Sequence, residues 1–119
     1  MATSKLRAEI KRFLLWTNPN PQNAFNAQTV SLDLSGFAAV EVIFRTGTGA
    51  KDRYTLPTVR VDIGNTGVIF NTTAYNSERR FTVNTTGIAF TNALYYASYG
   101  NWSGTNTSAL IPYKIYGIR

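Results

Sequence analysis

The sequence lacks the two residue types that support most nucleophilic and metal-dependent chemistry. Its 119 residues include no cysteine and no histidine. Without cysteine there is no disulfide and no thiolate zinc site, and without histidine the usual general base and the commonest metal ligand are missing. Only six carboxylates remain for acid–base work. We therefore expect a protein that is not an enzyme and that carries no metal and no cofactor.

Long apolar runs are also missing. None approaches the roughly 20 residues that a helix needs to cross a bilayer. The first residues, MATSKLRAEIKRFLLW, have the charge of a signal peptide, but their apolar core covers only residues 13–16 and no small-residue cleavage site follows. We expect an unprocessed, soluble chain that is synthesised in the cytoplasm and has no membrane partner.

The charge that is present is concentrated at the N-terminus. The net charge is +6, and four bases against Glu9 place +3 of it in the first twelve residues. Apolar residues at helical spacing, from Leu6 through Ile10 to Phe13, predict one or two helical turns there. A basic and apolar arm needs a partner to cover it, so we expect docking on another subunit or on an acidic protein. The residues expected to make this contact are Lys5, Leu6, Arg7, Ile10, Lys11, Arg12 and Phe13.

Two Asn-Pro pairs follow this arm. Pro19 and Pro21 push the preceding asparagines out of the helical region, which predicts an extended and stiff spacer. We expect the spacer to hold the arm away from the folded part, with an arm and spacer over residues 1–21 and a single domain over residues 22–119. In the alternative, residues 13–16 form the first strand of the domain, and only residues 1–12 remain as the docking arm.

From residue 28 onward, apolar and polar residues alternate with a period of two. Segments 29–34, 39–45 and 58–63 each place apolar side chains on one face and polar side chains on the other, as half-buried strands of antiparallel sheets do. The stretch FTVNTTGIAF, residues 81–90, predicts a hairpin in which Gly87 can adopt a positive φ. Short strands separated by turns rich in Thr, Asn and Gly predict an all-β protein, an antiparallel β-sandwich or jelly roll.

The last predicted strand, LIPYKIYGIR, is apolar on both faces. Tyr113 and Ile115 share one face and Tyr116 and Ile118 share the other, with Pro112 placed at the beginning of the strand, where no ladder donor is needed. A strand of this kind is covered on both sides. The second face should meet another layer, another subunit or the arm. We therefore expect a homo-oligomer with contacts through Tyr113, Tyr116 and Ile118.

Three stretches of the sequence together resemble a known module. LLWTNPNPQNAFNAQTVSLDLSGFAAVEVIFR, FTVNTTGIAF and the terminal LIPYKIYGIR are similar to a C-terminal module of tail-fibre or minor structural proteins in tailed bacteriophages and prophages of gut bacteria. The resemblance covers residues 14–119 and implies a β-sandwich displayed on a virion, commonly as a trimer, with no catalytic residues. Because the module makes up nearly the whole sequence, a small tail appendage is expected rather than a long fibre. A capsid decoration or head-fibre protein is the alternative location.

The densest aromatic stretch is LYYASYGNW, residues 94–102. Its rings could stack on the apolar faces of sugars in a host surface glycan, which would make the protein a carbohydrate-binding module. The alternative is that some rings fill the core and others fill a subunit contact, where Tyr and Trp are also enriched. The residues concerned are Tyr95, Tyr96, Tyr99 and Trp102.

Two further sets of charged residues need an interpretation. Asp33, Glu41 and Asp62 could act in sugar hydrolysis only if two of them converge across a cleft, and each is predicted on a polar strand face instead. Arg79 and Arg80 could join the basic arm in a nucleic-acid patch. The remaining bases are scattered along the chain, so nucleic acid is not expected as a partner.

Overall fold

The computed structural model describes residues 11–47, 56–71, 76–98 and 101–119. These residues form strands and no helix, so none of them belongs to a helix that could cross a membrane. The strands are β1 (Arg12–Thr17), β2 (Gln28–Ser31), β3 (Ala39–Gly47), β4 (Thr58–Asp62), β5 (Thr66–Asn71), β6 (Asn76–Asn84), β7 (Gly87–Phe90), β8 (Leu94–Ser98), β9 (Asn101–Thr105) and β10 (Ala109–Ile118).

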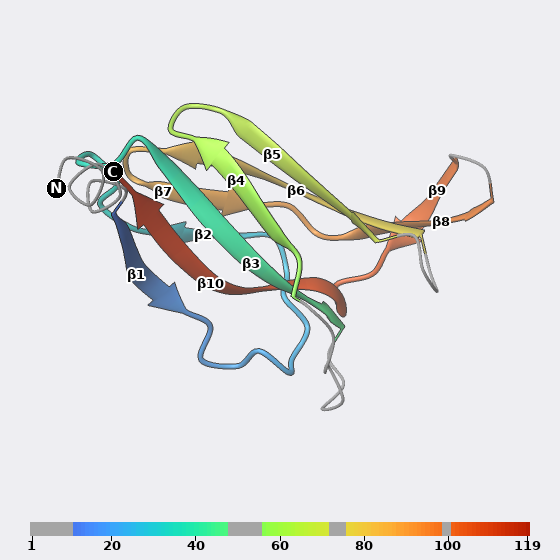
Figure 1. Cartoon of the computed structure of the whole chain (residues 1–119). Coiled ribbons are helices and arrows are strands. Elements are labelled where there is room, and N and C mark those ends of the chain that lie inside the picture. Colours follow the sequence, from blue (N-terminus) through green and yellow to red (C-terminus); the bar gives the residue numbers. More distant parts are fainter. Residues whose placement is uncertain (1–10, 48–55, 72–75, 99–100) are drawn as a thin grey trace, which may run out of the picture.

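Two antiparallel sheets face each other (Figure 1). Sheet A has the strand order β1-β10-β3-β4. Sheet B has the order β2-β7-β6-β8-β9, and β5 pairs with the free edge of β6. This arrangement confirms the predicted all-β, antiparallel β-sandwich.

The core lies where the apolar faces of the two sheets meet. Val42 and Phe44 on β3 are fully buried, as are Phe81 and Val83 on β6, in agreement with the alternation in the sequence. The rings of Phe44 and Phe81 pack across the two sheets with centroids 5.6 Å apart. Each such side chain contributes about 1.5–3 kcal/mol when it leaves water, so this layer is the main source of stability.

The predicted hairpin is confirmed as β6 and β7. Phe81 lies opposite Phe90 and Asn84 lies opposite Gly87, which leaves a two-residue turn between the strands. Gly87 has a φ of 150°, and a Cβ atom at this position would collide with the carbonyl oxygen of Val30 on β2. Glycine is therefore required here because the backbone of β2 approaches β7 closely.

Residues 13–16 belong to β1, so the alternative in which they form the first strand is correct. Phe13 lies opposite Gly117 and Leu14 opposite Tyr116 on β10, and a bulge between Leu14 and Trp16 shifts the register. The helical turns predicted as far as Phe13 are wrong for this residue, because pairing with β10 satisfies its backbone groups in a ladder. The rest of the predicted helical segment, residues 6–10, lies outside the described residues.

The Asn-Pro spacer is fastened to the sandwich, contrary to the expectation that it holds the arm away. Asn18 is buried, its backbone N–H donates to the Tyr113 carbonyl at 2.8 Å, and its Nδ2 donates to the Pro112 carbonyl at 2.8 Å. Arg45 Nη1 donates to the Pro21 carbonyl at 2.9 Å. The prolines keep this segment extended, and the hydrogen bonds attach it to sheet A.

Strand β10 begins earlier than predicted. Pro112 lies inside the strand, opposite Phe44, and a bulge follows it before Lys114. A bulge is one of the few places where a strand tolerates proline, because the missing N–H is not needed there. The preceding Leu110 is fully buried with a φ of 51°, a left-handed conformation that costs a non-glycine residue about 1–3 kcal/mol.

The sandwich is elongated, with extents of 53 × 29 × 29 Å. Its first and last strands meet at one end, where the Arg119 N–H donates to the Lys11 carbonyl at 3.0 Å. The hairpin of β8 and β9 extends at the opposite end (Figure 1). We refer to the residues Lys11, Arg12, Phe13, Leu14 and Arg119 as the terminal end.

Candidate ligand-binding groove

An interruption in sheet B lies beside a groove on the surface of the sandwich. Strand β6 pairs with β8 at residues 76–78 and with β7 at residues 81–84. Between these ladders, Arg80 faces the connection from β7 to β8. The Thr91 N–H donates to the Arg80 carbonyl at 2.9 Å, and the Arg80 N–H donates to Thr91 Oγ1 at 3.1 Å. A side-chain hydroxyl therefore replaces a backbone partner at the break.

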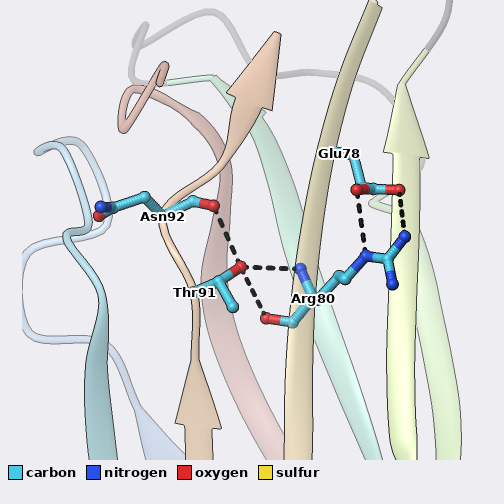
Figure 2. Close-up of polar contacts among 4 residues, drawn as sticks. All are labelled: Glu78, Arg80, Thr91 and Asn92. Carbon is cyan, nitrogen blue, oxygen red and sulfur yellow. Dashed lines mark hydrogen bonds and ion pairs between the residues drawn. The ribbon is translucent and has the colours of Figure 1, made fainter. Parts of the chain in front are cut away.

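The same hydroxyl also anchors the connection that follows. Thr91 Oγ1 lies 3.2 Å from the Arg80 carbonyl oxygen and 3.0 Å from the Asn92 carbonyl oxygen, either of which can accept its proton (Figure 2). Asn92 Oδ1 accepts the Ala27 N–H at 2.7 Å and so joins this connection to the segment before β2. The interruption is thus a defined structure with its backbone groups satisfied.

The groove beside this interruption encloses about 430 Å³. This volume lies within the range of small-ligand sites. Leu94 and Ala27 supply apolar surface, and polar side chains border it. The residues that line the groove are Ala27, Glu78, Arg80, Phe90, Thr91, Asn92, Leu94 and Thr105. We call this set the Arg80 groove.

One ion pair dominates the electrostatics of the Arg80 groove. Arg80 Nε donates to Glu78 Oε2 at 3.1 Å and Nη2 donates to Oε1 at 3.3 Å, so both carboxylate oxygens are engaged (Figure 2). The Glu78 side chain is only 4% exposed, whereas the Arg80 side chain is 60% exposed. Hydrogen bonding and charge attraction from Glu78 raise the pKa of Arg80. Solvent therefore meets the guanidinium, and the carboxylate lies beneath it.

Apolar side chains continue on the other side of this ion pair. In the ladder between β5 and β6, Phe70 lies opposite Glu78 and Val68 lies opposite Arg80, so all four share the outer face of sheet B. Phe70 is 57% exposed, a large fraction for an aromatic ring. The Arg80 guanidinium is therefore bordered by apolar surface both on β5 and in the groove.

The opposite face of β6 carries a second arginine in a different role. Arg79 is fully buried between the sheets and donates to three carbonyls: Thr91 at 2.6 Å, Leu110 at 2.7 Å and Ala109 at 3.0 Å. Its guanidinium also lies 5.5 Å from the centroid of the Phe25 ring. Burial lowers the pKa of Arg79 to about 10, which leaves it protonated at neutral pH. Arg79 therefore cannot join Arg80 in a surface patch for nucleic acid, a possibility that the sequence raised and did not favour.

The predicted aromatic site falls only partly on residues that the structure describes. Tyr95 on β8 is 37% exposed, and its ring lies against the backbone of Gly104 on β9. Tyr96 pairs in register with Trp102 across the same hairpin. The structure describes the backbone of these two residues and not their side chains, and Tyr99 lies outside the described residues. A contact through these rings stays a prediction.

The predicted docking arm is likewise described in part. Arg12 forms an ion pair with Glu41 at 2.8 Å and stacks over the Tyr116 ring at 3.6 Å. Phe13 is 38% exposed and packs against Phe37, with Arg119 5.0 Å from its centroid. Lys11 is exposed. Lys5, Leu6, Arg7 and Ile10 lie outside the described residues.

The predicted oligomer contacts lie on β10. Ile118 is 3% exposed, so its side chain is already covered within one chain. Tyr113 and Tyr116 are half-buried, with Lys114 5.2 Å from the Tyr113 ring centroid. The expected oligomer through these two rings stays a prediction.

The carboxylates considered for hydrolysis have structural partners. Asp33 accepts hydrogen bonds from the Ser35 N–H at 3.1 Å and from the Ser35 hydroxyl at 2.6 Å, which lower its pKa. Glu41 is engaged by Arg12. Asp62 lies on β4 next to a separate hollow that neither Asp33 nor Glu41 lines. Among the described residues, no group of three or more carboxylates could hold a metal ion.

The sequence analysis did not predict the Arg80 groove. Its residues come from four strands and two connections, and only the sheet pairing brings them together. One signal was present: apolar Val68 and Phe70 and charged Glu78 and Arg80 alternate with the buried positions of their strands. Strand alternation assigns each pair to the outer face of its own strand, and the pairing of β5 with β6 then places the two pairs side by side.

Comparisons with known proteins do not identify a relative. The sequence matches no protein-family model. No curated protein and no solved structure matches it either.

Proposed function

We propose that this chain is a non-enzymatic structural subunit of a tailed-bacteriophage virion, a small β-sandwich attached through its terminal end and displayed on the particle. The resemblance of residues 14–119 to a tail-protein module supports this role. The observation that carries the proposal is the polarity of the sandwich. The beginning of β1 and the end of β10 lie together at one end, and the aromatic β8–β9 hairpin lies at the other (Figure 1).

The terminal end has the surface that an attachment site needs. Lys11, Arg12 and Arg119 are exposed cations, and Leu14 beside them is 52% exposed. Exposed apolar side chains bordered by charge are typical of protein contacts. The partner is another subunit or an acidic virion protein, because the terminal end is rich in bases. A tail appendage is the preferred location, and a capsid decoration or head fibre is the alternative.

Electron microscopy of intact particles tests the location. Particles produced in the bacterial host would be labelled with an antibody against this chain. Label on the tail supports the appendage, and label on the head supports the decoration protein. Particles without label that nevertheless contain all other structural proteins would contradict the proposal.

A deletion tests the attachment. Removing residues 2–10 leaves β1 intact, and we expect a folded protein that no longer joins particles. The matched control is Arg80→Gln, which leaves the terminal end unchanged and should join particles as the wild type does. Normal incorporation of the deletion variant would show that the arm is not the attachment device.

A carbohydrate-binding module outside a virion is the second candidate function. The exposed Tyr95 at the β8–β9 hairpin favours it. In that case the purified chain would bind glycans, and the antibody would label no particle.

A further inference from the structure

The Arg80 groove has the features of a ligand site, and its unused hydrogen-bond donors indicate which ligand. Arg80 uses Nε and Nη2 on Glu78, and in the described part of the chain Nη1 has no partner. Asn92 accepts through Oδ1, and its Nδ2 likewise donates to no described residue. We propose that the Arg80 groove binds a short acidic saccharide, with the carboxylate of a uronic acid unit on the Arg80 guanidinium.

The exposed charge selects an anion. Glu78 neutralises Arg80 overall, but the carboxylate is 4% exposed and both of its oxygens face the guanidinium. An approaching ligand therefore meets cationic N–H groups first. A carboxylate can take two such donors at once, which a cationic or purely apolar ligand cannot do. The Glu78 carboxylate also fixes the orientation of the guanidinium and so prepares it for the ligand.

The remaining surface fits a sugar ring. A saccharide has an apolar C–H face and a polar edge, and the groove offers the matching arrangement. Leu94 supplies apolar surface in the groove next to Arg80, and Phe70 presents an exposed ring on the other side of the ion pair. Asn92 and Arg80 lie at opposite ends of the polar cluster, with Thr91 between them (Figure 2). A ligand of two or more sugar units is expected to use both ends, whereas one unit would use Arg80 alone.

The backbone around the groove argues against an extended acidic peptide. Peptides that bind along a strand use unpaired backbone groups of the protein. Here the N–H groups of Thr91, Arg80 and Ala27 are already bonded to described partners. The Ala93 carbonyl accepts the Asn106 N–H at 2.7 Å. The remaining hydrogen-bond donors belong to side chains. These donors can bind acceptor groups that project from a ligand, such as carboxylate and hydroxyl oxygens.

The biological setting of this site rests on the proposed display of the sandwich on a virion, but the binding itself does not. The purified full chain would be applied to an array of bacterial surface saccharides that contain uronic acids. Each saccharide would be paired with its carboxyl-reduced form, in which the carboxylate becomes a hydroxymethyl group and the rest of the ring is unchanged. Polyglutamate would be the acidic peptide probe. We expect binding to acidic saccharides and at least a roughly tenfold weaker signal for the reduced forms, because the charge-assisted hydrogen bonds are lost.

Substitutions locate the binding on the protein. Arg80→Gln retains a donor toward Glu78 and removes the cation, and we expect it to abolish the preference for the acidic form. Its matched control is Arg60→Gln, an exposed arginine on β4 of sheet A, which should bind as the wild type does. Phe70→Ala should weaken binding, while Leu14→Ala, an equally exposed apolar residue at the terminal end, should not.

Any of four outcomes would overturn the inference. These are equal binding to acidic and reduced saccharides, equal binding by the wild type and Arg80→Gln, binding to polyglutamate that matches the saccharides, and an array without any signal. None of these results affects the particle labelling, so failure of this site and failure of the proposed virion role can be told apart.

Discussion

Arg79 and Arg80 are neighbours on β6, yet they belong to two different regions of the molecule. Arg79 points into the core, is fully buried and donates to three backbone carbonyls. Arg80 points outward, and its side chain is 60% exposed above Glu78. Because side chains alternate along a strand, one step in sequence separates a residue that holds the fold from a residue that faces solvent. The two regions meet at Thr91, whose carbonyl accepts from Arg79 and whose hydroxyl accepts from the Arg80 N–H.

The substitution of arginine by glutamine at positions 79 and 80 should produce the largest difference in stability between the two regions. In Arg79→Gln the shorter side chain has two donors and cannot reach three carbonyls from one position, so at least one buried acceptor loses its partner. We expect the free energy of unfolding to fall by about 3 kcal/mol or more. In Arg80→Gln water replaces the exposed guanidinium, but the Glu78 carboxylate, whose side chain is 4% exposed, loses its cationic partner, so we expect a smaller fall than in Arg79→Gln. Chemical denaturation followed by tryptophan fluorescence measures both. Equal midpoints for the two variants would contradict the comparison.

Alternation and residue type point in opposite directions at Arg79. The sequence assigns Phe81 and Val83 to the buried face, and the same period of two assigns position 79 to that face, where the structure places it. Residue type argues against this position, because an arginine is almost never fully buried unless it is paired. Its partners are carbonyls of β10 and of the β7–β8 connection, which are distant in sequence. Only the tertiary structure shows that these carbonyls converge, so the local pattern cannot show how the buried charge is accommodated.

Substitution of two glycines can separate the cost of backbone strain from the cost of a steric collision. Gly87 and Gly64 both have positive φ, 150° and 94°, but only Gly87 has another backbone against it. Around Gly64 there is nothing within 4 Å of a Cβ atom. We expect Gly87→Ala to lose about 1–3 kcal/mol from strain alone and more from the collision with Val30. Gly64→Ala should show only the strain. Thermal unfolding of the two variants tests this, and equal losses would mean that the approach of β2 has no cost.

Thr91 contacts both arginines, and Thr91→Val should remove its contact with Arg80 while keeping its contact with Arg79. Valine has nearly the same shape, so the backbone carbonyl can still accept from Arg79 while the hydroxyl that serves Arg80 is removed. We expect a loss of about 0.5–1.5 kcal/mol, the value of a single hydrogen bond. Thr82→Val is the matched control, since its hydroxyl forms a hydrogen bond with the Thr66 hydroxyl, an exposed contact on the outer face. Denaturant unfolding of both variants measures the difference. A loss for Thr91→Val as large as that for Arg79→Gln would show that the inner and outer contacts are not separable.

The fold was more predictable than the groove for a physical reason. Each strand of the sandwich can be predicted from the alternation of apolar and polar residues in its own sequence. The β6–β7 hairpin requires only one local turn. The Arg80 groove depends on where β6 changes partner from β7 to β8, and this is set by the length of the connection and by the Thr91 hydroxyl. The spacer shows the same limit. Pro19 and Pro21 predict an extended chain, but the bonds of Asn18 to β10 decide that this chain is bound to sheet A.

The smallest effect is expected from a surface contact far from both arginines. Asp33 lies after β2, and its carboxylate accepts two hydrogen bonds from Ser35, which hold its pKa below the ordinary value of 3.8. A carboxylate with a lowered pKa in the folded state stabilises the protein above its unfolded pKa, and this contribution is lost as the pH falls through the folded pKa.

Asp33→Asn keeps an oxygen that can accept from Ser35 but cannot titrate there. At neutral pH we expect the variant to be slightly less stable than the wild type or equal to it. From about pH 5 to about pH 2 the stability of the wild type should decline relative to the variant. Urea unfolding across this range, with both proteins measured side by side, gives the difference. A wild type that gains stability relative to Asp33→Asn on acidification would contradict the role of Ser35. A loss of unfolding free energy comparable to that of Arg79→Gln would contradict the division between interior and surface contacts.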